Sequence, residues 1–136
     1  MKTKAAVVFE ASGKFNVESL EIDDPRDDEV LVRIVGVGIC HTDLGARDQH
    51  LPIPLPSVFG HEGSGIVEKT GSRVTKVKPG DHVVMSYGSC QACSSCKSGS
   101  NAYCTDFFLH NFNGARPDGS TTLKKDDQEI HGSFFG

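Results

Sequence analysis

The sequence predicts a single, mainly β domain, and three observations support this fold class. Short runs of apolar and β-branched residues recur along the chain, as they do in half-buried strands. The 15 glycines and 6 prolines provide frequent turns. No segment has a helical pattern long enough for a βαβ unit. With 136 residues, the chain is long enough for one domain with its own core and too short for two ordinary domains.

The first part of the chain predicts three strands. Lys4 to Phe9 and Phe15 to Ile22 are expected to form an opening hairpin, with a turn at Ala11-Ser12-Gly13. The β-branched run from Val30 to Val35 predicts a third strand, and the two glycines that follow it indicate close packing or a bulge. This third strand leads directly to Cys40.

A short helix and a loop are expected next. Thr42 and Asp43 are suited to cap a helix that runs as far as Arg47. The segment from Leu51 to Pro56 contains three prolines, which exclude a helix or a central strand and predict an extended surface loop. The loop ends just before the glycine-rich stretch from Val58 to Val67.

The second half predicts further short strands. Gly65 to Lys69, Val74 to Val77 and His82 to Ser86 have strand-like patterns, and Lys78 to Asp81 forms a tight turn before the last of them. The segment from Asn111 to Gly132 is polar and rich in turn signals. No internal repeat is present.

Charge and hydropathy exclude several classes of protein. The net charge is −4 and there is no long basic run, so the electrostatic signature of a nucleic-acid-binding protein is missing. No stretch approaches the roughly 20 apolar residues of a membrane span. The apolar run after the basic N-terminus, Ala5 to Phe9, is too short for a signal peptide. We therefore expect a soluble, cytoplasmic protein, in which five cysteines favour metal binding over disulfides.

Four cysteines form the most specific motif. The spacing C-x2-C-x2-C-x7-C places four thiolates where they can bind one zinc ion tetrahedrally. These residues are Cys90, Cys93, Cys96 and Cys104. Four protein ligands leave no position for a substrate, so the ion would stabilise a lobe, residues 88–106, that has little core of its own. Unpaired thiols, two disulfides and an iron–sulfur cluster are the alternatives.

Cys40, His61 and Glu62 form a second candidate set. A thiolate, an imidazole and a carboxylate together are typical of catalytic zinc sites that keep one position open. The alternative for Cys40 alone is a small buried apolar residue after a strand. The remaining histidines have no ligand spacing, and we interpret them as surface or packing residues; these are His50, His82, His110 and His131.

These motifs resemble a known family. The pattern Gly60-His61-Glu62-x2-Gly65-x5-Gly71-x2-Val74 looks like the zinc signature of medium-chain alcohol dehydrogenases. The spacing of the four cysteines resembles the structural-zinc lobe of that family. Cys40-His41-Thr42-Asp43 resembles its first catalytic-zinc segment, and Lys78-Pro79-Gly80-Asp81 resembles its usual turn. The resemblance covers nearly the whole chain, with the motifs in the family's order.

The resemblance implies a chaperonin-10-like (GroES-like), partly open β-barrel that serves as the catalytic domain. Cys40 and His61 would be ligands of a catalytic zinc, with Glu62 beside it as an exchanging or supporting group. Thr42 would receive the alcohol proton, and His41 would lie near the pyrophosphate of the cofactor. The family oxidises alcohols to aldehydes with NAD or NADP and commonly forms homo-oligomers. Ser86-Tyr87-Gly88-Ser89 resembles the aryl-alcohol and benzyl-alcohol members, which favours aromatic or bulky primary alcohols.

The chain departs from this family at several positions. Gly45 stands where many members have a histidine that relays the proton to solvent. No cysteine follows Cys104 to act as the third catalytic ligand, and no complete G-x-G-x-x-G fingerprint of a dinucleotide-binding Rossmann domain is present. The chain ends in the apolar, strand-like segment 133–136. We therefore expect residues 1–136 to be a truncated N-terminal catalytic domain that lacks the Rossmann domain and is inactive alone.

A function from another class fits the same residues. The chain can be interpreted as a zinc-structured β scaffold or interaction module, in which His61 and Glu62 only form hydrogen bonds in the core. Fold class alone does not separate a scaffold from an enzyme. The number of bound zinc ions does: about two per full-length chain for the enzyme and about one for the scaffold.

Overall fold

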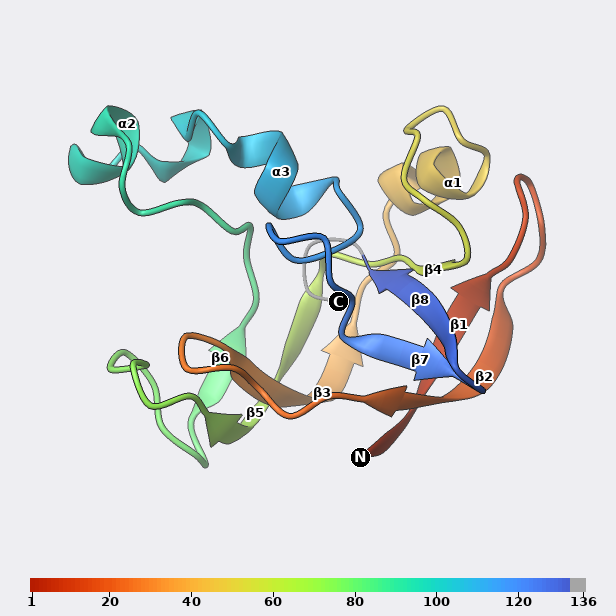
Figure 1. Ribbon diagram of the computed structural model, residues 1–136, viewed down its shortest axis with the longest axis horizontal. Helices are drawn as coiled ribbons and strands as arrows, with labels where there is room; N and C mark the ends of the chain where they lie inside the picture. Colours follow the sequence, from red (N-terminus) through yellow and green to blue (C-terminus); the bar gives the residue numbers. More distant parts are fainter. Residues whose placement is uncertain (133–136) are drawn as a thin grey trace.

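The structure is a computed structural model that describes residues 1–132. It is mainly β, as the sequence predicts (Figure 1). The described strands are β1 (Lys2–Val8), β2 (Asn16–Ile22), β3 (Val30–Val37), β4 (Ser57–Val58), β5 (Gly63–Thr70), β6 (His82–Val84), β7 (Leu123–Lys125) and β8 (Gln128–Gly132). The helices are α1 (His41–Arg47), α2 (Ser94–Lys97), the 3-10 helix η1 (Asn101–Tyr103) and α3 (Phe107–Asn111).

Five of the strands close into a small barrel in the order β1-β2-β7-β8-β4. The predicted hairpin of β1 and β2 is confirmed, with antiparallel pairs from Lys2↔Glu21 to Val7↔Asn16. Alternate residues of these strands face inward, because successive side chains of a strand point to opposite faces. The barrel core contains the buried residues Val7, Leu20, Leu123 and Ile130.

The other three strands form a separate sheet in the order β3-β5-β6. The predicted strand at Val30 is confirmed and continues to Val37, with an irregular register between Ile34 and Gly36, where the sequence indicates a bulge. Gly65 of β5 lies so close to β3 that a Cβ there would overlap the Arg33 carbonyl. In this sheet, β3 leads into the segment that contains Cys40, and the segment that contains His61 leads into β5.

The helices α1, α2 and α3 lie on one side of the strands (Figure 1). α1 follows β3, whereas α2, η1 and α3 belong to the long excursion between β6 and β7. None of the helices within residues 1–132 combines the length and the apolar character that spanning a bilayer would require.

Three expectations for the second half of the chain are wrong. Val74–Val77 is not a strand, because the backbone just before it is bonded to the loop before β3: Gly71 N donates to Glu29 O (2.9 Å) and Arg73 N to Asp27 O (2.7 Å). The predicted strand from His82 ends at Val84 rather than Ser86. The segment Asn111–Gly132 does not consist only of turns, because it contains the hairpin of β7 and β8.

The β7–β8 hairpin has weak sequence signals. Only Leu123 and Ile130 of these strands are buried, while the other side chains are polar. The turn consists of Asp126 and Asp127, both with positive φ (47° and 67°), which suits a two-residue hairpin loop. α3 was also not expected from the sequence.

Two further expectations need correction. α1 begins at His41 with Cys40 as its N-cap, so Thr42 lies inside the helix. The loop Leu51–Pro56 is irregular, as expected, but Ile53 is buried within the domain rather than exposed at its surface. The turn at Lys78–Asp81 is confirmed by the hydrogen bond from Asp81 N to Lys78 O (3.1 Å). The apolar segment 133–136 lies outside the described residues.

Candidate metal centres

The four cysteines of the C-x2-C-x2-C-x7-C motif converge on one point. Their Sγ atoms all lie within 4.8 Å of one another. Cys90 follows β6, Cys93 is the N-cap of α2, Cys96 lies in α2, and Cys104 is the C-cap of η1. The Cys90 and Cys96 sulfurs are 3.9 Å apart. Four sulfurs that each lie about 2.3 Å from one zinc ion are separated by about 3.8 Å, so this cluster fits a tetrahedral ion.

Backbone N–H groups surround these sulfurs. Ala92 N and Cys93 N donate to Cys90 Sγ at 3.4 and 3.3 Å, and Cys90 N donates to Cys104 Sγ at 3.3 Å. Hydrogen bonds from the backbone N–H groups of Cys96 and Thr105 lower the pKa of the Cys93 thiol to about 6. Such donors favour the thiolate, which is the form that binds metal.

Burial has the opposite effect on the pKa of the Cys96 thiol. The pKa of Cys96 rises to about 12, because burial disfavours the charged form and the neighbouring cysteines add hydrogen bonds that keep it protonated. All five cysteines lie in the described part of the chain, and each is a free thiol. The cluster is therefore a set of unpaired sulfurs arranged around a common centre.

Cys40, His61 and Glu62 form the second cluster, as the sequence suggests. One ligand atom from each lies within 4.8 Å of the others. Cys40 lies between β3 and α1, as the N-cap of α1, and the other two residues directly precede β5. Cys40 and His61 are half-buried, whereas Glu62 is exposed. A thiol, an imidazole and a carboxylate around one centre suit a zinc site with an open position, although such a site normally has three firm protein ligands.

Asp43 is a member of this site that the sequence analysis did not assign. Its carboxylate is buried, and Oδ2 accepts a hydrogen bond from Cys40 N (2.8 Å), which caps α1. Oδ1 lies 3.4 Å from His61 Nδ1. A carboxylate behind a histidine fixes the ring orientation and leaves Nε2 for a metal. The sequence does contain a capping box, with Cys40 as N-cap and Asp43 at the third helical position. It was not recognised, because cysteine is an unusual N-cap residue.

Two glycines make room for this cluster. A Cβ at Gly38 would overlap the Glu62 carboxylate, and Gly38 N donates to Glu62 O at 2.9 Å. A Cβ at Gly63 would overlap the Met85 methyl group. Gly38 and Gly63 therefore allow β3, the His61–Glu62 segment and the chain after β6 to approach closely.

The other predicted residues lie at the start of α1. The Thr42 Oγ1 is 3.5 Å from the Cys40 sulfur, in hydrogen-bond contact with it. His41 is exposed at the first position of the helix. Gly45 faces open space, since no atom would lie within 4 Å of a Cβ there. Among residues 1–132, no other cysteine or histidine joins the cluster of Cys40, His61 and Glu62.

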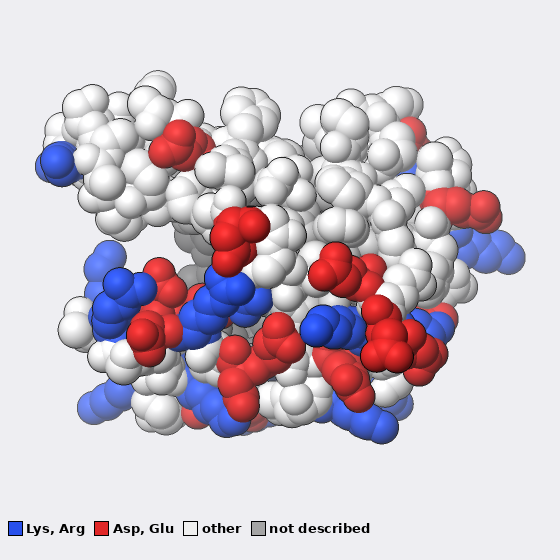
Figure 2. Space-filling model, in the orientation of Figure 1, with Lys and Arg blue, Asp and Glu red and all other residues white. Residues whose placement is uncertain are grey.

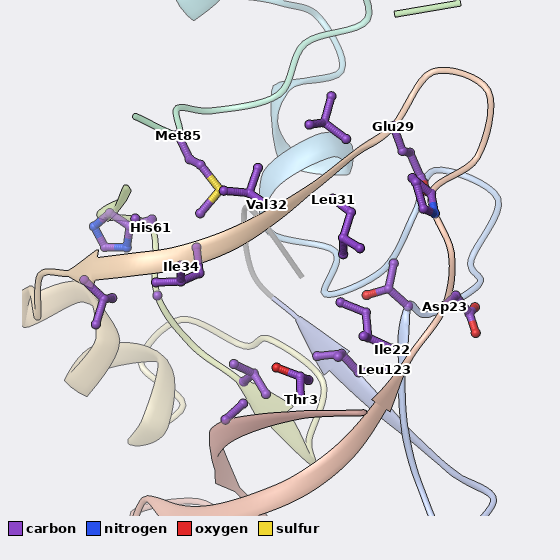
Figure 3. A pocket seen from close by; sticks show the side chains of 18 of the residues that line it. Thr3, Ile22, Asp23, Glu29, Leu31, Val32, Ile34, His61, Met85 and Leu123 are labelled. Atoms are coloured by element: carbon purple, nitrogen blue, oxygen red, sulfur yellow. The ribbon is translucent and has the colours of Figure 1, made fainter. Parts of the chain in front are cut away.

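An open cavity of about 430 Å³ extends from His61 between the barrel and the three-stranded sheet. Figure 3 shows His61 and Met85 at one end, Ile34 along the wall, and Asp23 and Glu29 at the other end. Most of the lining side chains are apolar. The His61 ring therefore borders an apolar space.

Comparison with known proteins gives a consistent result. The family model described as "Alcohol dehydrogenase GroES-like domain" matches residues 26–125. A geraniol dehydrogenase from Castellaniella defragrans is 46% identical over the whole chain, which covers 36% of that protein. A crystal structure of an alcohol dehydrogenase zinc-binding domain protein from Burkholderia ambifaria has a TM-score of 0.96 and 49% identity, with coverage of 99% of this chain and 37% of that one.

The benzyl alcohol dehydrogenase of Acinetobacter calcoaceticus is also similar in structure. Its TM-score is 0.92 at 46% identity, with coverage of 100% of this chain and 36% of that chain. The expected GroES-like fold is thus confirmed. The chain spans about a third of the length of the curated relatives that it matches.

Proposed function

The chain belongs to the alcohol dehydrogenase GroES-like domain family, and we propose that it is the zinc-binding catalytic domain of an enzyme that oxidises primary alcohols to aldehydes, with hydride transfer to NAD or NADP. One observation carries this proposal: Cys40, His61 and Glu62 meet around one centre, with Asp43 behind the imidazole. A scaffold would have no need for a partly open, mixed set of ligands.

In this proposal each residue of the cluster has a separate task. Cys40 and His61 hold zinc, and Glu62 lies beside it as an exchanging or supporting group. A bound zinc ion supplies Lewis acidity, which lowers the pKa of an alcohol hydroxyl. Asp43 keeps the His61 ring oriented. Because the site needs a third firm ligand, we propose that it comes from outside residues 1–132.

Thr42 is the proposed acceptor of the alcohol proton. Its hydroxyl contacts the Cys40 sulfur, and this contact supports a role beside the substrate hydroxyl. A hydroxyl group can accept one proton and donate its own, so it can pass a proton outward. Gly45 offers no side chain for the next step, and we propose that water or a cofactor hydroxyl takes the proton from Thr42.

The cofactor and the zinc lobe complete the proposal. A nicotinamide supplies the hydride-acceptor chemistry. His41 is exposed, and we propose that it contacts the cofactor's pyrophosphate. The four cysteines of residues 88–106 hold a second, structural zinc ion, which stiffens the excursion between β6 and α3. Assembly of the whole enzyme as a homo-oligomer is part of the same proposal.

The proposed substrates are aromatic or otherwise bulky primary alcohols. Two similar proteins are described as a geraniol dehydrogenase and a benzyl alcohol dehydrogenase. Both names refer to primary alcohols with unsaturated carbon next to the reacting carbon. We propose the same substrate class for the protein that carries this chain.

The test is oxidation of benzyl alcohol by the whole protein with NAD and with NADP. Cys40→Ala and His61→Ala should each lower kcat/KM at least about 100-fold, because even the supporting partners of metal ligands cost 10- to 100-fold. His50→Ala, a change at an exposed histidine, is the control. Undiminished turnover in the two ligand variants would refute the assignment, and about one zinc ion per chain instead of two would favour the scaffold.

A further inference from the structure

An asparagine–glycine pair lies just beyond α3. Asn113 is exposed, whereas Gly114 is buried. Within residues 1–132 the Asn113 side chain forms no hydrogen bond, and Gly114 N donates to no acceptor. In this part of the chain, therefore, neither the side-chain amide nor the backbone nitrogen that follows it is held by another group.

Such a pair has the chemistry of a spontaneous modification site. The backbone nitrogen can attack Cγ of the preceding asparagine, which closes a succinimide ring; the amide nitrogen leaves as ammonia and takes the proton of the attacking nitrogen with it. Water then opens one of the two C–N bonds of the ring. One opening gives aspartate, and the other gives isoaspartate, in which the main chain passes through the side-chain carbon. A glycine in the second position favours the attack, because it has no Cβ to hinder it.

The other asparagines of the chain are held or hindered. Asn111 is buried, and Gly88 N donates to its Oδ1 (2.7 Å) while its Nδ2 donates to Gly88 O (2.9 Å). Asn16 lies in β2 and Asn101 in η1, where the backbone is part of a regular element. All three are followed by a residue with a Cβ. Asn113 is the asparagine that the fold leaves open to the reaction.

A comparable pair, Asp118–Gly119, lies shortly after it and is protected. Asp118 Oδ1 accepts hydrogen bonds from Ser120 N (3.0 Å) and Ser120 Oγ (2.7 Å), and Oδ2 accepts one from Arg26 Nη1 (2.7 Å). Gly119 N donates to Arg116 O at 2.8 Å. Both reacting groups are occupied, so the fold should prevent the same ring closure at this second pair.

Gly114 is packed tightly where several segments meet. A Cβ on this glycine would lie 3.3 Å from His131 Cβ, Ile53 Cγ2 and Pro54 Cδ. Its φ of +66° is rare for other residues. Gly114 O accepts a hydrogen bond from Gly132 N at 3.0 Å. An isoaspartate adds a carbon to the main chain directly before this glycine, and so tightly packed a site has no space to absorb the added length.

The negative charge that the reaction creates should be tolerated. Within residues 98–115 the only charged side chain is Asp106. On the face shown in Figure 2 the charges gather mainly over the lower part of the molecule, whereas the surface over α3, which Asn113 follows, is mostly white. A carboxylate at an exposed position also stays solvated and interacts weakly with distant charges. The damaging product is therefore isoaspartate rather than aspartate.

We propose that Asn113 is a site of spontaneous modification, converted through a succinimide to aspartate and isoaspartate, and that isoaspartate releases the end of β8 from Gly114. The inference does not depend on the proposed function. Its consequence still reaches the candidate site: Gly132 of β8 pairs with Val58 of β4, and Val58 lines the cavity beside His61.

Peptide mapping of the whole protein, after incubation in mildly alkaline buffer, tests the reaction. In the tryptic peptide of residues 98–124, Asn113 should gain the mass difference between an amide and an acid, and its isoaspartate should accept a methyl group from a protein-isoaspartate methyltransferase. Asn101, Asn111 and Asp118 of the same peptide should stay unchanged in the folded protein, although Asp118 should isomerise in a denatured sample. An intact Asn113 in the folded protein would overturn the inference. Equal conversion of Asn111 would also overturn it, since the fold would then select no site.

Thermal unfolding tests the structural consequence. Aged wild-type protein should unfold at a lower temperature, in proportion to its isoaspartate content. Aged Asn113→Gln should show no such loss, because glutamine keeps the amide but has to close a larger ring, which is slower. Fresh Asn113→Asp, which adds the charge without lengthening the main chain, should unfold like the fresh wild type. An unchanged midpoint at high isoaspartate content, an equal loss in aged Asn113→Gln, or an equal loss in fresh Asn113→Asp would each contradict the release of β8 by isoaspartate.

Discussion

Asp43 and His61 form a carboxylate–imidazole pair, with 3.4 Å between Asp43 Oδ1 and His61 Nδ1, at the point where α1 begins. The other oxygen of the same buried carboxylate accepts the hydrogen bond from Cys40 N that caps the helix. One side chain thus joins two of the proposed zinc ligands, Cys40 through its backbone and His61 through its ring. The start of α1 and the orientation of the imidazole therefore depend on the same residue.

Replacement of this carboxylate should weaken the proposed catalytic zinc site. Asp43→Asn retains an oxygen that can cap α1 but loses the charge that faces His61. The affinity of the Cys40–His61 site for zinc should fall about 10- to 100-fold. Competition with a chelator measures this in the whole enzyme, and the four-cysteine site should be unaffected. Asp48→Asn is the matched control, because Asp48 pairs with Arg47 at the other end of α1; equal affinity in the Asp43 and Asp48 variants would contradict the role of Asp43.

The four-cysteine cluster should determine the stability of the lobe. Cys96→Ser removes a buried ligand from the site, so the chain should lose one tightly bound zinc ion and stability on the order of several kcal/mol. Metal analysis after gel filtration and thermal unfolding measure the two effects. Ser95→Ala changes the neighbouring residue and should retain the ion. A Cys96→Ser chain that keeps a full equivalent of zinc would show that the cluster is not the binding site.

Two glycines should respond to the same substitution in opposite ways. Gly45→Ala should raise the free energy of unfolding by about 0.5–1 kcal/mol, since Gly45 lies in α1 and a Cβ there meets no other atom within 4 Å. Gly65→Ala should lower it by about 1–3 kcal/mol, because the added Cβ overlaps the Arg33 carbonyl of β3. Denaturant unfolding of both variants measures the difference. Destabilisation by Gly45→Ala would mean that this glycine has a packing role.

The strands that the sequence predicted are those with long β-branched or apolar runs. β1, β2, β3 and β5 contain several apolar or β-branched residues, which produce a recognisable pattern even though β2 and β3 each bury only one of them, Leu20 and Leu31. The β7–β8 hairpin was missed because only Leu123 and Ile130 reach the core, and the other side chains of the two strands are polar. Val74–Val77 has an apolar pattern, but the loop before β3 binds the adjacent backbone first. The local sequence pattern gives no information about such hydrogen bonds between distant segments.

The sequence predicted the four-cysteine cluster more completely than the cluster of Cys40, His61 and Glu62. The cysteine spacing alone indicated a cluster, since short gaps leave the thiols few alternatives to a common centre. Cys40 and His61 are far apart in the sequence, and only their ligand chemistry and the family resemblance joined them before the structure did. Asp43 was taken as part of a helix start, and its contact with His61 depends on how β3 and β5 pair, which sequence does not state. The roles of these residues in zinc binding and catalysis stay predictions.

The ion pair between Glu29 and Arg116 should make stability depend on pH. Both guanidinium and carboxylate are partly shielded, with side-chain exposures of 9% and 30%, and Arg116 Nη2 donates to Glu29 Oε2 at 2.9 Å. The hydrogen bond from Arg116 lowers the pKa of Glu29 below its ordinary value of 4.5, against the opposing effect of burial. A carboxyl with a lowered pKa in the folded state stabilises the fold above its unfolded pKa. That contribution is lost as the pH falls through the lower, folded pKa.

The wild-type chain should therefore lose stability steeply below about pH 4.5, and Glu29→Gln should show a shallower loss, because a neutral amide has no proton to gain. At pH 7 the variant should be less stable than the wild type, and the two curves should converge in acid. Thermal unfolding between pH 3 and pH 7 measures this, with Glu129→Gln, at an exposed position of β8, as the control. Parallel curves for the wild type and Glu29→Gln would show that this pair does not govern the acid sensitivity.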